Sequence, residues 1–307
     1  MDKYDSYLEP TPEPTQPITK RNLVRPTQLG VPQKSRKRSF GYSKPLVVLF
    51  VAFLVYIFAP FRSNILILGI DRTPEGTDIG RSDTIILLGL QPFTGQASML
   101  SIPRDLWVPI PGYGENRVNA AHSFGELEQP GYGPRLALAT VHQNFGIGVS
   151  QYLRIRLEGF ADVVDALGGI EITLDQAAAG YSPGTYRLNG EQALAFVRDR
   201  TGDDFFRMQH GQVFIISVIK KMINPVSWLR IPAAIFAMLQ TVDTNIPFWE
   251  WLRLSIALLR AVLFNGIHAA AIPREAVTPW VTDAGAQVLL PNWDLILPMV
   301  REMFGLF

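Results

Sequence analysis

Charged residues of both signs lie between short apolar runs in one stretch of the sequence: Asp71, Arg81, Asp83, Arg104 and Asp105. Two carboxylates held close together repel each other and favour a hard divalent cation. An arginine beside them could bind the other end of a phosphate that the cation bridges. These residue types therefore suit chemistry on a phosphate or pyrophosphate. The alternative is that each is a solvated loop charge, which is usual for such residues, and the sequence alone favours neither.

The runs between these charges have the pattern of strands, and the first two are nearly continuous apolar runs, as expected for strands buried on both faces. They are Asn64–Ile70 (NILILGI), Thr84–Leu90 (TIILLGL) and Gln96–Ile102 (QASMLSI). Residues 91–95 (QPFTG) predict a hairpin loop between the second and third runs. If the three strands form an up-and-down meander, the end of the first, the start of the second and the end of the third share one edge. We therefore predict that Asp71, Asp83 and Arg104 converge there.

A second charged cluster surrounds a predicted helix start. Arg198 and Arg200 end one helix, and Arg207 follows the start of the next at Asp203 or Asp204. Because free N–H groups at a helix start favour anions, three arginines here could clamp a phosphate or pyrophosphate. The alternative is a set of surface salt bridges with the neighbouring aspartates. Arg117 and Asn119 form a weaker third candidate.

The rest of the body alternates helices and strands, which predicts an α/β fold, a central mixed sheet flanked by helices in an αβα sandwich. The expected helices are Glu158–Leu167 with Gly168-Gly169 as its cap, Glu191–Arg198 with Asn189 as N-cap, a long helix ending near Ile223, and the stretches Ile231–Val242 and Trp249–Phe264. Ile170–Leu174 is a further expected strand. The last two helical stretches are short or contain arginines, so we interpret them as packed helices rather than membrane passes.

Composition and missing motifs exclude several classes of protein. The 307 residues include no cysteine, which excludes disulfide scaffolds, Cys-ligated zinc and a Cys nucleophile. The sequence has no P-loop, no H-E-x-x-H and no G-x-S-x-G motif, so a P-loop NTPase, a zincin and a nucleophile elbow are not indicated.

The N-terminal part predicts a tail and an anchor. Residues 1–44 are rich in proline and hold nine Lys or Arg against four Asp or Glu, which predicts a disordered basic tail. The uncharged run Leu46–Phe61 predicts a single transmembrane anchor over residues 45–61. Since the basic cluster precedes the run, the N-terminus is expected in the cytoplasm and residues 62–307 outside the cell membrane. A buried core element or a cleaved signal peptide is the alternative. The preceding tail argues against the first, and the lack of an A-x-A site against the second.

Six ordered motifs resemble those of the LytR-CpsA-Psr family. They are NILILGID (64–71), GRSDTIIL (80–87), LSIPRDLWVPIPGYG (100–114), RVNAAHSFG (117–125), EGFADVVDALGGIEI (158–172), and LNGEQALAFVRDR followed by DDFFR (188–207). A weaker match lies at residues 277–293. The resemblance implies an α/β domain with a hydrophobic tunnel for a polyprenyl chain. It also implies transfer of a phosphoglycopolymer from a polyprenyl-pyrophosphate carrier to a cell-wall acceptor, usually peptidoglycan, with Mg²⁺ as cofactor. A pyrophosphatase side activity is a variant of the same chemistry. Apart from the resemblance, the body after residue 44 is mildly acidic, with 19 Lys or Arg against 23 Asp or Glu, which argues against nucleic acid as a partner.

The resemblance also implies roles for individual residues. Asp71 and Asp83 would bind the magnesium, and Asp83 would also be catalytic. The pyrophosphate would be held, and the reaction assisted, by four arginines: Arg104, Arg198, Arg200 and Arg207. Asp204 would support this set, and Arg81 and Arg117 would add contacts to the substrate.

The sequence departs from the family pattern at two positions. After Arg207 the family carries an Arg-Gln pair, whereas this sequence has His210 and Gly211. Gln209 or Gln212 could compensate from the same helix. The departure leaves open a second hypothesis, a non-catalytic envelope regulator that binds polyprenyl pyrophosphate without turnover.

Overall fold

The computed structural model describes residues 43–71, 77–199 and 204–305, and the predicted basic tail lies almost wholly outside them. Residues Val48–Phe307 form one compact unit. Its strands are β1 (Ser63–Ile70), β2 (Ser82–Gln91), β3 (Gln96–Ser101), β4 (Trp107–Ile110), β5 (Gly114–Arg117), β6 (Gln151–Arg156), β7 (Ile170–Leu174), β8 (Gly184–Leu188), β9 (Val242–Thr244), β10 (Ile267–Ala271), β11 (Val277–Val281) and β12 (Gln287–Pro291). Its α-helices are α2 (Ala120–Glu128), α3 (Gly133–Phe145), α4 (Leu157–Ala166), α5 (Gly190–Arg198), α6 (Asp204–Ile223), α7 (Ile231–Thr241), α8 (Phe248–Arg260) and α9 (Trp293–Phe304). The short helices η1 (Pro225–Arg230), η2 (Ala261–Asn265) and η3 (Arg274–Ala276) follow α6, α8 and β10.

A six-stranded mixed sheet forms the centre of the unit, in the order β10-β3-β2-β1-β6-β9. The neighbours β1, β2 and β3 pair antiparallel, which confirms the predicted meander and the hairpin after Gln91. β6 runs parallel to β1, and β10 runs parallel to β3. The meander therefore brings the end of β1, the start of β2 and the end of β3 to one edge.

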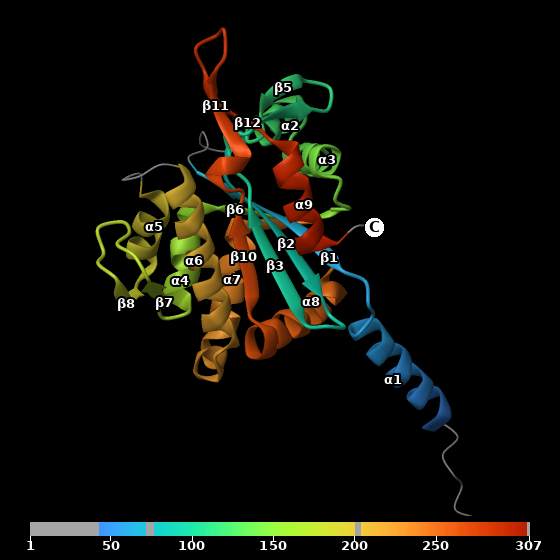
Figure 1. Ribbon diagram of the computed structural model, residues 1–307. Coiled ribbons are helices and arrows are strands. Elements are labelled where there is room, and N and C mark those ends of the chain that lie inside the picture. The colour runs from blue at the N-terminus through green and yellow to red at the C-terminus, as the bar shows by residue number, and fades with distance from the viewer. Residues whose placement is uncertain (1–42, 72–76, 200–203, 306–307) are drawn as a thin grey trace, which may run out of the picture. The chain divides into compact units, whose positions relative to one another are not determined.

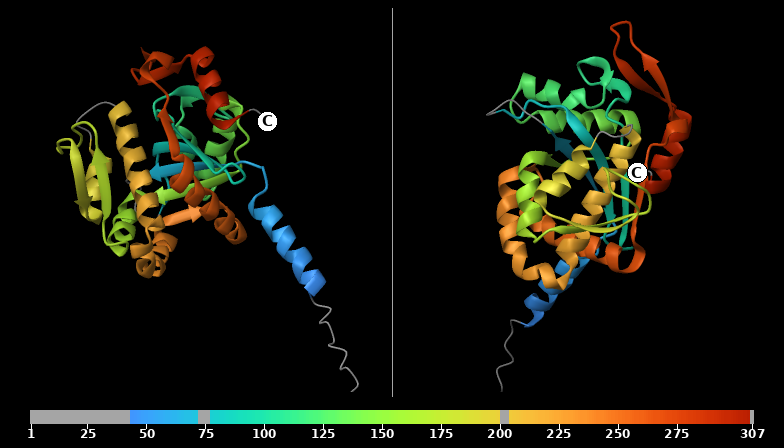
Figure 2. Two further views of the ribbon diagram at one scale, coloured as in Figure 1. Left: turned by 60° about the horizontal axis from the view of Figure 1, so that its bottom comes forward. Right: turned by 90° about the vertical axis from the view of Figure 1, so that its left-hand side faces the viewer.

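Helices cover both faces of this sheet, so the predicted αβα sandwich is confirmed (Figures 1 and 2). Leu66 and Leu68 of β1 belong to a core cluster that includes α2, α3 and α9. Ile65 and Ile67 belong to a second cluster, with α4 to α8. Since successive side chains of a strand point to opposite faces, burial of both sets explains why the strand is apolar at nearly every position.

Local signals in the sequence fix the helices near the charged residues. The Asn189 side chain accepts a hydrogen bond from the Gln192 backbone N–H, and Gln192 completes a capping box at the start of α5. The chain leaves α4 through Gly168 and Gly169, at φ of +77° and +85°, where glycine costs little. The expected helix to Ile223 is confirmed as α6, and the two later helical stretches as α7 and α8 followed by η2.

The predicted anchor coincides largely with helix α1 (Ser43–Ile57), which has 15 residues. Among the described residues, no single helix is long and apolar enough to cross a membrane. Residues 205–223 and 225–241 reach the required length and apolarity only together, across a bend of 89°. The transmembrane anchor stays a prediction.

Side chains nearly fill the apolar space where α4, α5 and α6 meet. The pocket there includes Phe160, Val164, Val197 and Phe214 and holds a cavity of about 10 Å³. That is room for about one water molecule, so a tunnel wide enough for a lipid chain is not open at this place.

Candidate functional site

Asp83 occupies an irregularity in the ladder between β1 and β2. Gly69 pairs with Thr84 and Ile70 pairs with Ser82, so Asp83 is the extra residue of a β-bulge. A Cβ atom on Gly69 would lie 2.9 Å from the Thr84 Cβ, which explains why glycine stands there. Bulges re-aim side chains at the ends of strands and beside active sites. The bulge therefore sets the direction of this carboxylate, and periodicity alone could not have revealed it.

Arg104 is brought to Asp83 by the turn that follows β3. The Ile102 N–H donates to the Ile85 carbonyl at 2.9 Å, which continues the ladder beyond β3. The Arg104 Nη1 then donates to Asp83 Oδ1 at 2.7 Å. The predicted convergence of Asp83 and Arg104 is confirmed, and both side chains stay about one quarter exposed, at 27% and 28%.

Asp105 extends this pair into a chain of alternating charges. Its two carboxylate oxygens lie 3.4 Å from Arg104 Nε and 3.3 Å from Arg117 Nη1. The backbone of Asp105 also accepts a hydrogen bond from the Leu289 N–H of β12 at 2.9 Å. The C-terminal hairpin β11–β12 thus supports this turn, a contact that sequence reasoning missed.

Asp71 lies at the same edge, since it follows Ile70, the partner of Ser82. Its Oδ1 accepts hydrogen bonds from Arg198 Nε at 2.9 Å and Nη2 at 2.5 Å. Arg198 is the last residue of α5, so the capped helix aims its end at the sheet edge. The Asp71 side chain is only 7% exposed, whereas that of Arg198 is 27% exposed.

We call Asp71, Asp83, Arg104, Asp105, Arg117 and Arg198 the strand-edge cluster. Each of its members has an ionic partner, so the alternative of isolated solvated loop charges does not describe them. Among the other predicted site residues, Arg81 is exposed just before β2, and Arg207 is part-buried in the first turn of α6. Arg200 and the side chain of Asp204, the first residue of α6, lie outside the described part of the chain.

The donor set at this edge fits a divalent cation that keeps part of its own water shell. Asp71 and Asp83 supply carboxylate oxygens, the ligands that Mg²⁺ prefers, and Mg²⁺ is usually bound by one or two carboxylates plus water and substrate phosphate. Among the described residues, no group of three or more acidic or histidine side chains is gathered for a metal. Any cation here would therefore depend on substrate oxygens for the rest of its ligands.

The two positions that depart from the family pattern lie on α6 between the sheet and α5. His210 is 6% exposed, and its ring lies 4.8 Å from that of Phe196 between centroids. Burial lowers the pKa of His210, although nearby Asp199 opposes this effect. The Gln212 amide donates to Ser101 Oγ at 2.9 Å and to the Ala270 carbonyl at 2.6 Å, so it fastens α6 to the sheet rather than extending the arginine set. Gln209 is exposed.

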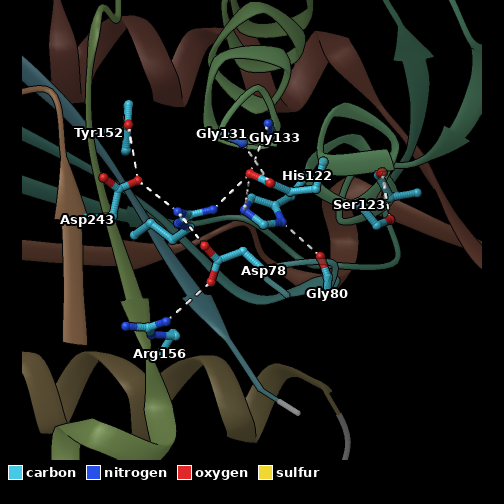
Figure 3. Close-up of polar contacts among 12 residues, drawn as sticks. Asp78, Gly80, His122, Ser123, Gly131, Gly133, Tyr152, Arg156 and Asp243 are labelled. Atoms are coloured by element: carbon cyan, nitrogen blue, oxygen red, sulfur yellow. Dashed lines mark hydrogen bonds and ion pairs between the residues drawn. The ribbon is translucent and has the colours of Figure 1, made fainter. Parts of the chain in front are cut away.

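A second polar cluster, which sequence reasoning missed, holds the segment just before β2 (Figure 3). Arg154 of β6 lies at its centre, with an 8% exposed side chain. Arg154 donates to Glu126 at 2.8 Å and to Asp78 at 3.0 Å, and lies 3.0 Å from Asp243. Glu126 also accepts from the backbone N–H groups of Gly131 and Gly133. We call Asp78, His122, Glu126, Arg154 and Asp243 the Arg154 cluster. Its one sequence signal is an arginine set among the apolar residues Tyr152, Leu153 and Ile155 of β6.

His122 completes this cluster from α2. The ring is fully buried, and its Nδ1 lies 2.8 Å from the Gly80 carbonyl, so Nδ1 carries the proton and donates. The Nε2 atom has no hydrogen-bond partner among the described residues and lies 3.9 Å from Glu126 Oε1. Burial lowers the pKa of His122, which favours the neutral ring.

With this geometry established, comparison with known proteins gives the family. The LytR_cpsA_psr family model matches residues 61–288. The chain belongs to this family. The match includes every member of the strand-edge cluster and of the Arg154 cluster.

Individual relatives agree with this assignment. Over 144 residues the chain is 44% identical to the polyisoprenyl-teichoic acid–peptidoglycan teichoic acid transferase TagU of Oceanobacillus iheyensis, covering 46% of this chain and 44% of that protein. It is 34% identical over 191 residues to TagU of Bacillus cereus (strain AH820), covering 60% of each. The chain thus matches about half the length of these curated relatives. A solved structure described as TagT bound to LI-WTA superposes with a TM-score of 0.64 at 25% identity, covering 79% of this chain and 89% of that one.

Proposed function

We propose that the protein transfers a phosphoglycopolymer from a polyprenyl-pyrophosphate carrier to a cell-wall acceptor, with peptidoglycan as the expected acceptor. The observation that carries this proposal is the strand-edge cluster, where Asp71 and Asp83 each face an arginine from a different element. The names of the TagU relatives and the wall-teichoic-acid ligand of the TagT structure support the same substrate class.

The reaction needs charge neutralisation and positioning more than a protein nucleophile. An oxygen of an acceptor hydroxyl forms a bond to the phosphorus that carries the glycopolymer. The bond from that phosphorus to the bridging oxygen breaks, the carrier leaves as polyprenyl phosphate, and the hydroxyl proton passes to a base. Arg104 and Arg198 would hold the pyrophosphate oxygens, with Arg117, Arg200 and Arg207 around them. Arg81, exposed at the same edge, would contact the substrate.

The ion pairs give these arginines a resting arrangement. Arg104 neutralises Asp83 and Arg198 neutralises Asp71. When a pyrophosphate binds with its cation, the carboxylates would take the cation and the arginines would turn to phosphate oxygens. Partial exposure of both arginines and of Asp83 favours this exchange, whereas the Asp71 carboxylate is buried and needs a cation at all times. Bound Mg²⁺ would neutralise negative charge on the pyrophosphate, and Asp71 and Asp83 are the residues that would hold it.

We further propose that the chain is a single-pass membrane protein with its catalytic unit on the outer face. The side chains of α1 are apolar and exposed almost throughout, which is costly in water and favourable in lipid. The basic residues before α1 support a cytoplasmic N-terminus. The polyprenyl chain would occupy the apolar layer between the sheet and α4 to α6, which would have to open from its closed form.

A non-catalytic lipid-binding regulator is the second candidate. It is favoured by His210, which stands at the position where the family carries an arginine. The His210 ring is buried against Phe196. A clamp that lacks this arginine would keep carrier affinity and lose turnover.

Turnover distinguishes the two candidates. Full-length protein in detergent is incubated with a polyprenyl-pyrophosphate glycolipid, peptidoglycan fragments and Mg²⁺, and the lipid products are followed by mass spectrometry. A transferase releases polyprenyl phosphate and joins the glycan to the fragment, and Asp83→Ala abolishes both. Carrier binding without release would support the regulator. Release without joining would indicate a pyrophosphatase.

A further inference from the structure

Large apolar side chains are exposed on the segments that follow α6. They are Val226, Trp228 and Leu229 of η1, Ile235, Phe236 and Leu239 of α7, Phe248, Trp249 and Leu252 of α8, and Leu263 and Phe264 of η2. Leu229 is 95% exposed and Val226 85%. We call these residues the apolar end. Large apolar side chains exposed on successive segments in this way are typical of contact with a membrane or a partner.

The apolar end and the strand-edge cluster lie at opposite ends of the sheet (Figures 1 and 2). α6 begins beside the strand-edge cluster and ends before η1, and its 20 residues span about 30 Å. Arg260, the last residue of α8, donates to the Pro92 and Phe93 carbonyls of the β2–β3 hairpin. That hairpin is at the other end of β2 from Asp83, so α8 also lies far from the charged edge.

The apolar end is continuous with the end of α1. Arg253 of α8 donates through Nη2 to the Phe61 carbonyl at 2.6 Å, and its guanidinium lies 5.8 Å from the centre of the Tyr56 ring. The guanidinium of Arg260 lies 5.3 Å from the centre of the Phe58 ring. A bilayer that held α1 up to these residues would therefore meet α8.

Cations border the apolar end. A pocket of about 260 Å³ beside Val226 is lined by Arg187, Lys221 and Arg230, with Glu171 as the acidic residue of its lining. This excess of positive charge suits acidic headgroups, which attract basic residues at a membrane surface. Tryptophan beside Lys and Arg is typical of the boundary between headgroups and acyl chains.

We propose that the apolar end rests in the surface of an anionic phospholipid bilayer. The exposed side chains of η1, α7, α8 and η2 enter the boundary of the acyl region, and the cations of the pocket lie among the headgroups. Such a contact follows the physics of interfacial helices, with an apolar face in the lipid and cations at its border. The proposal rests on the proposed membrane anchor, and it places the strand-edge cluster about 30 Å above the headgroups, at the height of α6.

The absence of cysteine makes the test direct, because single cysteines can be introduced for spin labels. Full-length Leu229→Cys is labelled and reconstituted in liposomes of phosphatidylcholine and phosphatidylglycerol at 3:1. Collision with oxygen, which concentrates in lipid, is compared with collision with a water-soluble nickel chelate. Leu127→Cys, exposed on α2, is the control for water, and Val51→Cys in α1 is the control for the anchor.

We expect the Leu229 label to give an oxygen-to-nickel ratio several-fold above that of Leu127 and below that of Val51, because the boundary of the acyl region is shallower than the middle of the anchor. A Leu229 label in water with Val51 in lipid would overturn the proposal and leave the anchor standing, and the transfer assay would be unaffected. A Leu229 label shielded from both reagents, with spin–spin broadening, would show that a second copy covers the surface and would also overturn it. If the Leu229 label lay as deep in liposomes of pure phosphatidylcholine as in those with phosphatidylglycerol, the role given to the pocket cations would be overturned.

Discussion

The strand-edge cluster and the Arg154 cluster both lie near the start of β2, and they differ in how exposed their charged side chains are. The strand-edge cluster holds Asp71 and Asp83 with arginines that are about one quarter exposed. The Arg154 cluster holds Asp78 and Gly80. The side chains of its Arg154, Glu126 and His122 are 8%, 3% and 0% exposed. Exposed ion pairs exchange partners at small cost, whereas a buried pair broken on one side leaves an unpaired charge. The Asp83–Arg104 pair of the strand-edge cluster is exposed enough to rearrange around a ligand, whereas Asp71 of the same cluster is buried. The Arg154 cluster holds the segment just before β2 in place.

Removing the central arginine tests the buried side of this comparison. Arg154→Met leaves Glu126 buried without its cation, so we expect a loss of about 3–5 kcal/mol in the free energy of unfolding. Arg156→Met is the matched control on the same strand. Its side chain is 52% exposed and also reaches Asp78, at 3.6 Å, so a loss below about 1 kcal/mol is expected. Urea unfolding, followed by circular dichroism, measures the free energy of unfolding of both variants. Equal losses in the two variants would contradict the distinction between buried and exposed ion pairs.

Removing an arginine from the strand-edge cluster should affect catalysis instead. Arg104→Ala takes away a cation that would stabilise the transferring phosphate, and we expect turnover to fall about 100- to 1,000-fold. The free energy of unfolding should change by less than about 1 kcal/mol, because the pair with Asp83 is partly exposed. The transfer assay and urea unfolding are run together, with Arg301→Ala on α9 as a control.

If Arg104→Ala instead unfolded the protein while keeping turnover per folded molecule, the strand-edge cluster would be structural. Both clusters would then serve stability, and the difference in role between them would be contradicted.

Acid should weaken the buried cluster. The pKa of His122 is lowered in the folded state below its ordinary value of 6.5, and that of His210 is lowered too. The unfolded chain then binds more protons, so stability falls as the pH drops below about 6.5, with a slope of up to about 1.4 kcal/mol per pH unit for each histidine. His122→Asn keeps a donor for Gly80 and should flatten this slope, whereas His268→Asn, on an exposed position of β10, is the control. If His122→Asn left the slope of the free energy of unfolding against pH unchanged, the acid sensitivity would come from other groups.

The smallest effect is expected beside the strand-edge cluster. Gly211 lies inside α6, and among the described residues a Cβ atom there would meet only the Thr84 Cγ2 at 3.7 Å, an ordinary contact. Gly211→Ala should therefore raise the free energy of unfolding by about 0.5–1 kcal/mol, the helix propensity difference between the two residues. Thermal unfolding measures the gain. A loss of stability would mean that α6 is pressed closer to β2 than this contact indicates.

Local pattern was sufficient for much of the fold. The apolar runs predicted β1, β2 and β3, and the meander they form follows from the short hairpin at Gln91. Asn189 predicted the start of α5, and Gly168 and Gly169 predicted the end of α4, because capping depends on a few adjacent residues. The strands β6, β9 and β10 escaped prediction. They join the sheet through partners far along the chain, and their short sequences, QYLRIR, VDT and IHAAA, carry no continuous apolar run or clear alternation that marks a strand.

For the candidate site, the sequence by itself determined the residue types and placed Asp83 and Arg104 at one edge, since a meander fixes which strand ends meet. Only the tertiary structure decided which arginine faces which carboxylate. Arg198 pairs with Asp71 across 127 positions of sequence, a contact set by the packing of α5 on the sheet. The bulge at Asp83, the burial of His210 and the cluster around Arg154 were likewise decided by packing. Burial and partner choice depend on surfaces that the whole chain brings together, whereas strand and helix signals depend on neighbours in the sequence.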